Sequence, residues 1–87
     1  MKSEIQSDID LILTLLNNAE ELVTISNSRD DAKKVLQAIK IFAQGHQVKV
    51  PEPLINELIK NIVDFPPQKI SNNIKQIARE ISLSNLD

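Results

Sequence analysis

One apolar spacing, alternating between three and four residues, occurs four times along the chain and constrains its fold more than any other feature. This is the period of one face of an α-helix, so each stretch predicts an amphipathic helix with one apolar seam. Four such helices in a short chain predict an all-α fold, an antiparallel up-down-up-down four-helix bundle. The seams consist of Ile5, Ile9, Ile12, Leu16, Ala19 and Val23; of Ala32, Val35, Ile39 and Phe42; of Ile55, Leu58, Ile62 and Phe65; and of Ile70, Ile74, Ile77 and Ile81.

The length and the charge pattern agree with a single bundle. A chain of 87 residues has room for one domain. The net charge of the four helical regions alternates in sign along the sequence, negative in the first and positive in the second. In an antiparallel bundle each helix then lies beside neighbours of opposite sign, which favours that arrangement. The predicted domain covers residues 1–87, with helices at about 4–25, 29–44, 53–65 and 67–83.

Two signals mark the limits of the second helix. Ser28 is a typical N-cap residue, and Asp31 follows three residues later as a partner resembling a capping box. Gly45 is the only glycine in the chain. Its position suits the left-handed residue that often follows a helix, so we expect the second helix to end there.

Prolines mark both ends of the third helix. Pro53 suits the first helical position, where its missing N–H group costs nothing. Pro66 biases Phe65 away from helical angles, so the third helix is expected to stop by Phe65. Pro67 then opens the fourth helix, because Ile70 is already in phase with the last seam.

The residue types give little support to catalysis or to a cofactor. His46 is the only histidine, and there is no cysteine, so the ligands of a transition-metal site are missing. One glycine cannot form a glycine-rich phosphate loop. We therefore predict a protein that is not an enzyme, with no catalytic, metal or cofactor site. His46 is expected to be a polar residue near a helix end.

Binding of nucleic acid is also not expected. Arg29, Lys33, Lys34 and Lys40 lie on the second helix, but the net charge of the chain is −2 and aromatic stacking residues are almost absent. The longest apolar run is far shorter than the roughly 20 residues of a transmembrane helix. Acidic residues near the N-terminus do not fit a signal peptide. These features predict a cytoplasmic protein.

Two apolar residues of the first helix remain outside its seam. Leu11 and Ile25 fall on the face away from the other seam residues. They are candidates for a second apolar contact, with a partner, with a second copy of the chain, or with the loops at the bundle ends.

The segment that starts the third helix carries a resemblance to a known family. Its sequence, Pro-Glu-Pro-Leu-Ile-Asn-Glu-Leu over residues 51–58, resembles the third-helix start in immunity proteins against pediocin-like bacteriocins, most closely the enterocin A type. The order of the elements is also similar: a long helix, a shorter one, a loop, the proline-led helix and a final helix rich in Ile, Lys and Asn.

The resemblance implies both a fold and a function. Proteins of this family are antiparallel four-helix bundles that protect the producing cell from its own membrane-permeabilising peptide. The implied partners are the mannose permease that serves as the bacteriocin receptor, the cognate bacteriocin, or both. The resemblance also implies a cytoplasmic location that allows peripheral association with the inner face of the membrane.

Specificity in the family lies largely in the C-terminal half, which points to the outward stripe of the last helix. This outward stripe consists of Lys69, Asn72, Gln76, Arg79, Leu83 and Leu86. The stripe has an alternative interpretation as an ordinary solvated face. The alternative function is a small helical interaction or regulatory module, resembling an antitoxin or an adaptor and homodimeric in one version. For the oligomeric state, a monomer is favoured.

Overall fold

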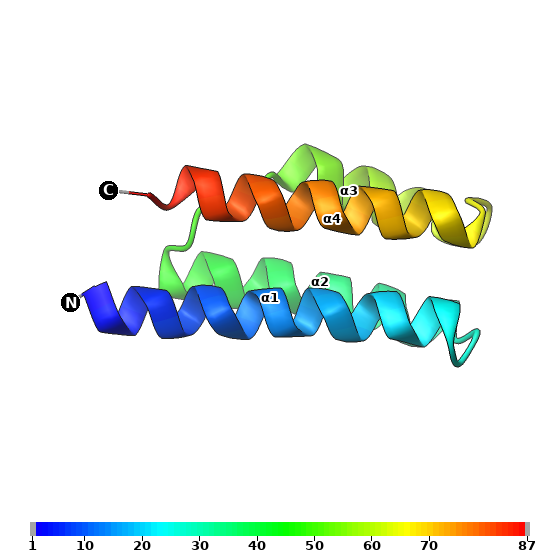
Figure 1. Ribbon diagram of the computed structural model, residues 1–87, viewed down its shortest axis with the longest axis horizontal. Helices are drawn as coiled ribbons and strands as arrows, with labels where there is room; N and C mark the ends of the chain where they lie inside the picture. The colour runs from blue at the N-terminus through cyan, green and yellow to red at the C-terminus, as the bar shows by residue number, and fades with distance from the viewer. Residues whose placement is uncertain (1, 87) are drawn as a thin grey trace.

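The computed structural model describes residues 2–86, with side chains described from Ile5 to Leu86. Successive helices run in opposite directions, with α1 and α2 in one layer and α3 and α4 in the other (Figure 1). Each helix packs on the next, and α4 packs back on α1. The predicted all-α four-helix bundle is confirmed. Its helices, with no strand in the described residues, are α1 Lys2–Thr24, α2 Arg29–His46, α3 Glu52–Asn61 and α4 Pro67–Ser84.

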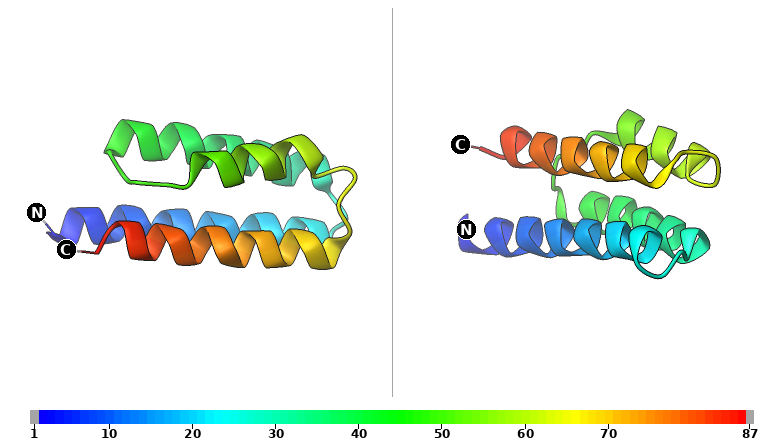
Figure 2. Two further views of the ribbon diagram at one scale, coloured as in Figure 1. Left: turned by 90° about the horizontal axis from the view of Figure 1, so that it is seen from above. Right: turned by 45° about the vertical axis from the view of Figure 1, so that its right-hand side comes forward.

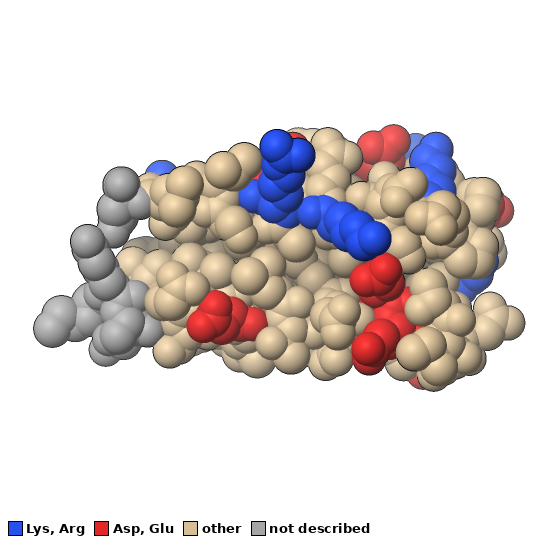
Figure 3. Space-filling model, viewed as in Figure 1, with Lys and Arg blue, Asp and Glu red and all other residues tan. Residues whose placement is uncertain are grey.

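The connections divide between the two ends of the bundle. The start of α1, the end of α4 and the α2–α3 connection lie at one end, and the α1–α2 and α3–α4 turns lie at the other (Figure 2). In Figure 3, basic side chains over α4 border acidic side chains over α1, as the alternating charge of the helices predicts. Within residues 2–86, no helix combines the length and the apolar character that crossing a bilayer requires.

The apolar seams of α1, α3 and α4 form the core, with two exceptions. Ile5 was expected in the α1 seam but is 49% exposed. Ile5 lies in the first turn of α1, which extends beyond the end of α2. The last residue of α2, His46, is level with Asp8, one turn further along α1, since its Nδ1 lies 3.2 Å from Oδ2 of Asp8. Phe65 is half-buried. The buried members of these seams are Ile9, Ile12, Leu16, Ala19 and Val23 in α1; Ile55, Leu58 and Ile62 at α3; and Ile70, Ile74, Ile77 and Ile81 in α4.

The core face of α2 is rotated from the predicted one. Leu36 and Ala43 are buried, whereas Val35 and Phe42, which the seam included, are half-buried at its edge. Both sets fit the three-and-four spacing, and both include Ala32 and Ile39. The packing of α2 against α1 and α3 decides between them. Leu36 and Ala43 are buried in the core, and Val35 lines a hollow on the outside against α1.

The turn between α1 and α2 does not contain the predicted capping box. Ser28 occupies the N-cap position, but its side chain makes no capping hydrogen bond with the helix. Its Oγ donates instead to the carbonyl of Ser26, at 3.4 Å. The chain reverses at Asn27, whose φ of 51° lies in the left-handed region that asparagine tolerates.

The end of α2 lies beyond Gly45, so the predicted stop was wrong. Gln47, not Gly45, adopts the left-handed conformation, with φ 58°. The N–H of Val48 donates to the carbonyl of Ala43 at 2.9 Å, and that of Gln47 donates to the carbonyl of Gln44 at 3.4 Å, the two bonds of a Schellman motif. Val48 and Ala43 are both buried. The left-handed conformation of Gln47 turns the chain so that the next residue, Val48, packs in the core. A reversal at Gly45 would not place Val48 there.

The α2–α3 connection completes the core where α3 is too short to cover it. The 10 residues of α3 span about 15 Å, whereas the 23 residues of α1 span about 35 Å. Val48 is buried in the uncovered half. Asn85, just after α4, holds this connection: its Oδ1 accepts from the N–H of Lys49 at 3.1 Å, and its Nδ2 donates to the Lys49 carbonyl at 2.9 Å. The Asn85 carboxamide thus pairs with both backbone polar groups of Lys49, as the backbone of a neighbouring β-strand would.

The third helix ends at Asn61 and not at Phe65 as predicted. Pro66 has no N–H group to offer the carbonyl of Ile62, four residues earlier. Nη1 of Arg29 donates to that carbonyl at 2.6 Å and to the carbonyl of Phe65 at 2.7 Å. A side chain from α2 therefore replaces the missing donor, and the chain turns after Asn61 around the guanidinium.

The starts of the last two helices follow the prolines closely. Glu52 is the first residue of α3, so Pro53 occupies the second helical position and not the first. The N–H group that it lacks would be unsatisfied there too, so the helix loses nothing. Pro67 opens α4, as predicted.

Candidate functional site

The outward stripe predicted from Lys69 to Leu86, here the α4 stripe, lies on and just beyond the outward face of α4. All six of its residues are exposed. Those from Lys69 to Leu83 lie on the side of α4 opposite its buried isoleucines, and Leu86 follows after the helix has ended. Nζ of Lys69 lies 4.2 Å from the centre of the Phe65 ring, a cation–π contact. Nε2 of Gln68 donates to Oδ1 of Asn72 at 3.1 Å. These contacts are local, so the stripe is available to a partner.

The chemistry of the stripe changes along its length. Its first part carries the ammonium of Lys69 and carboxamides, and its last part carries Leu83 and Leu86, two of the large apolar residues that are exposed. Between them, Gln76 and Arg79 line a shallow hollow that Leu83 completes. A surface with cations, amides and exposed leucines is suited to another protein, because it offers hydrogen bonds and apolar area together.

The second predicted contact, Leu11 and Ile25, lies on a different side of the bundle. Leu11 is 45% exposed and Ile25 is 78% exposed. Ile25 lines a hollow between α1 and α2 together with Leu22 and Val35. Helical spacing continues this surface along both helices. The resulting α1–α2 apolar face consists of Leu11, Leu15 and Leu22 from α1, Ile25 just after it, and Val35, Ala38 and Phe42 from α2. Asn18 and Glu21 line the same hollow and interrupt it.

One end of the α1–α2 apolar face is closed by a polar contact. His46 stacks on Phe42 with 4.0 Å between the ring centres and 21° between the planes. The same imidazole lies 3.2 Å from the Asp8 carboxylate. The sequence places His46 only near a helix end. The structure adds its role in joining the end of α2 to α1.

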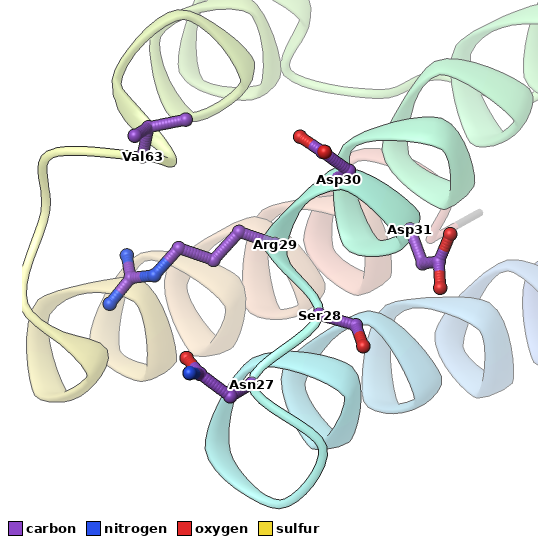
Figure 4. Close-up of a pocket in the computed structure, with 6 residues that line it drawn as sticks. All are labelled: Asn27, Ser28, Arg29, Asp30, Asp31 and Val63. Carbon is purple, nitrogen blue, oxygen red and sulfur yellow. The ribbon is translucent and has the colours of Figure 1, made fainter.

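A polar hollow at the other end of the bundle was not expected from the sequence. Residues 27–31 and Val63 line it, and Figure 4 shows the Arg29 side chain extending toward the α3–α4 connection. The guanidinium of Arg29 already donates to two carbonyls there. Its charge therefore stabilises the fold, and the hollow has no convergent set of groups for a ligand.

Among the described residues, no three or more His, Asp or Glu side chains come together in a way that could hold a metal ion. The contacts of His46 are the acidic and aromatic ones above. The α4 stripe and the α1–α2 apolar face are thus the two candidate surfaces. Comparison of the chain with known protein families, with curated proteins and with solved structures found no match.

Proposed function

We propose that this chain is an immunity protein that protects a bacteriocin-producing cell against a pediocin-like, membrane-permeabilising peptide. It acts in the cytoplasm by binding and not by catalysis. The observation that carries the proposal is the third helix: a short, proline-led helix with the family-like segment 51–58, third in an antiparallel bundle whose other helices are much longer. The resemblance in sequence and the order of the helices in space agree.

The α4 stripe is the proposed contact surface. Its cation at Arg79, its carboxamides at Asn72 and Gln76 and its terminal leucines are all exposed, so a partner can contact them without disturbing the core. The partner proposed from the resemblance is the mannose-permease receptor, alone or with the bound bacteriocin. Binding there would keep the peptide from opening the membrane.

Protection of a sensitive cell is the direct test. The chain is expressed in a bacteriocin-sensitive Gram-positive host, and inhibitory concentrations are measured for several pediocin-like peptides against an empty-vector control. The proposal predicts that the inhibitory concentration of at least one peptide rises about tenfold or more. Unchanged inhibitory concentrations for every peptide, with the protein present in the cells, would contradict it.

A second candidate function is a helical interaction or regulatory module that has nothing to do with bacteriocins. The α1–α2 apolar face favours it, because this surface is apolar and lies away from the α4 stripe. The two candidates differ in the surface they use. Loss of function on substitution of Leu11, with no effect of substituting Arg79, would favour the interaction module.

A further inference from the structure

The turn between α3 and α4 holds the first residue of the α4 stripe in place. Nζ of Lys69 lies 4.2 Å from the centre of the Phe65 ring. Lys69 is exposed and Phe65 is half-buried, so the ring covers one side of the ammonium and solvent covers the rest. A lysine side chain is flexible in water, whereas this contact gives its charge a defined position.

We propose that Lys69 binds an acidic side chain of the partner protein, and that Phe65 is the positioning residue that holds the Lys69 ammonium for this contact. The inference rests on the proposed immunity function, because it assigns one contact within the α4 stripe. It adds the chemistry of the partner at that point, an Asp or Glu carboxylate, and it adds a residue outside the stripe.

The charge of the α4 stripe favours an acidic partner. The stripe contains two cations, Lys69 and Arg79, and no acidic residue. Glu80 lines the same hollow as Arg79 and offsets part of its charge. The first turn of α4, which contains Lys69, has no acidic residue. The positive charge is therefore least compensated at Lys69, where complementarity with a carboxylate across an interface is greatest.

Lys69 occupies a position where the helix itself disfavours a cation. It is the third residue of α4, at the end where the helix dipole is positive. Among the described residues, the ion pair is that of His46 with Asp8, so no described carboxylate pairs with Lys69. A charge placed against the preference of its own helix is expected at a functional surface.

The backbone of Phe65 is held on both sides of its ring. Its N–H donates to the Asn61 carbonyl at 2.9 Å, and its carbonyl accepts from Nη1 of Arg29 at 2.7 Å. Figure 4 shows the Arg29 side chain extending to this connection. Pro66 follows and restricts the Phe65 backbone further. The ring therefore projects from a fixed turn, and Lys69 lies against it four residues later.

The charge explains why this position carries an aromatic ring. The α3 seam predicts Phe65 in the core, but the structure leaves it half-buried. The largest fully buried side chains are all Ile or Leu. An aliphatic side chain would cover the same apolar surface, but only an aromatic ring has a negative face that attracts an ammonium. Holding the charge before binding lowers the entropic cost of fixing it in the complex.

Substitution of Lys69 tests the contact with the partner. The protection factor is the ratio of inhibitory concentrations with and without the protein in the sensitive host. Lys69→Gln changes an exposed side chain, and we expect it to lower the protection factor about fivefold. Lys69→Glu should lower it further, because it would oppose one carboxylate to another. Lys75→Gln is the matched control, since Lys75 is an exposed lysine of α4 that lies off the stripe.

The outcomes separate this proposal from the immunity function. Lys69→Gln that protects as well as the wild type would overturn the proposal and leave the immunity function standing. Equal losses from Lys69→Gln and Lys69→Glu would exclude an acidic group on the partner. A wild type that protects against no peptide would overturn the function and the proposal together.

A double-mutant cycle tests whether Phe65 acts through Lys69. Phe65→Leu keeps an apolar side chain without the ring, and we expect about a threefold loss of protection. In the Lys69→Gln background the same change should cause no further loss, because no ammonium remains to be held. Phe65→Tyr keeps the ring and should protect as the wild type does. Phe42→Leu is the matched control, because Phe42 is the other half-buried ring and lies on α2.

Proton NMR of the purified full chain gives a readout that a change in stability alone would not move. The ring current should shift the ε-methylene protons of Lys69 upfield. This shift should vanish in Phe65→Leu and persist in Phe65→Tyr. Ordinary lysine shifts in the wild type would overturn the positioning role. No loss of protection in Phe65→Leu, or the same loss in both Lys69 backgrounds, would overturn it as well.

Discussion

Replacing Arg29 tests how the two layers of the bundle are joined at the end opposite the termini. The Nη1 atom of Arg29 donates to the carbonyls of Ile62 and Phe65 at 2.6 and 2.7 Å. Pro66 cannot supply the N–H group that a continuing helix would offer Ile62. Arg29→Ala removes both hydrogen bonds and leaves these carbonyls to water.

The expected loss follows from the type of bond. In a buried site, loss of a hydrogen bond from a charged donor lowers the free energy of unfolding by about 1.5–3 kcal/mol. Arg29 is half-buried, so water replaces part of each bond. We expect Arg29→Ala to lower the free energy of unfolding by about 2 kcal/mol. For a domain of this size, that corresponds to a fall in Tm of about 8–16 °C.

Urea denaturation followed by far-UV circular dichroism measures this loss. Arg29→Lys keeps the charge and N–H donors on a nitrogen with a different position and geometry, so its loss should be intermediate. Lys33→Ala is the matched control, because Lys33 is exposed one turn further along α2. Its effect should stay within about 0.5 kcal/mol. The reasoning fails if Arg29→Ala is as mild as Lys33→Ala, because the guanidinium would then contribute nothing to the end of α3.

Three further predictions test the rest of the fold by the same denaturation assay. Asn85→Ala should cost about 1–2 kcal/mol and speed hydrogen exchange at the amide of Lys49, and unchanged exchange would show that Asn85 does not hold the loop. Gly45→Ala should stabilise the chain in dilute solution by about 0.5–1 kcal/mol, because Gly45 is helical and faces open space; destabilisation would refute that geometry. Ile39→Ala should cost about 2–5 kcal/mol and Ile41→Ala less than about 0.5 kcal/mol, since Ile39 is fully buried and Ile41 is 72% exposed; similar losses would mean that the core face of α2 is assigned wrongly.

Periodicity predicted the helices well and their exact faces less well. The α4 seam was predicted completely, because only one set of apolar residues there has the three-and-four spacing. The α2 sequence carries two such sets that share Ala32 and Ile39. Choosing between Val35 with Phe42 and Leu36 with Ala43 depends on where the neighbouring helices lie, which is a tertiary property.

The ends of the helices were set by interactions that local sequence rules do not contain. Gly45 has the residue type that usually stops a helix, but burial of Val48 stops α2 two residues later. The sequence places Arg29 on the second helix without a partner, yet its side chain donates to the carbonyls at the end of α3, more than 30 residues away. Such pairings become visible only when the chain is folded.

The candidate surfaces could be predicted in part. The spacing of Lys69, Asn72 and Gln76 places them on one outward face, and they do lie there. Leu11 and Ile25 were found as residues that the seam left over. Their continuation onto α2 was not predicted, because Val35 and Phe42 were assigned to the core and not to the face beside it.

The central claim, that the outward face of α4 protects the cell, is tested most directly by one comparison of inhibitory concentrations. Sensitive cells express the wild type, the stripe variant Gln76→Ala with Arg79→Ala, or the control Lys33→Ala with Gln37→Ala, which removes a similar exposed pair from α2. The account predicts that the wild type and the control protect equally, and that the stripe variant loses most protection at an unchanged Tm. Full protection by the stripe variant, or a loss accompanied by a lower Tm, would contradict it.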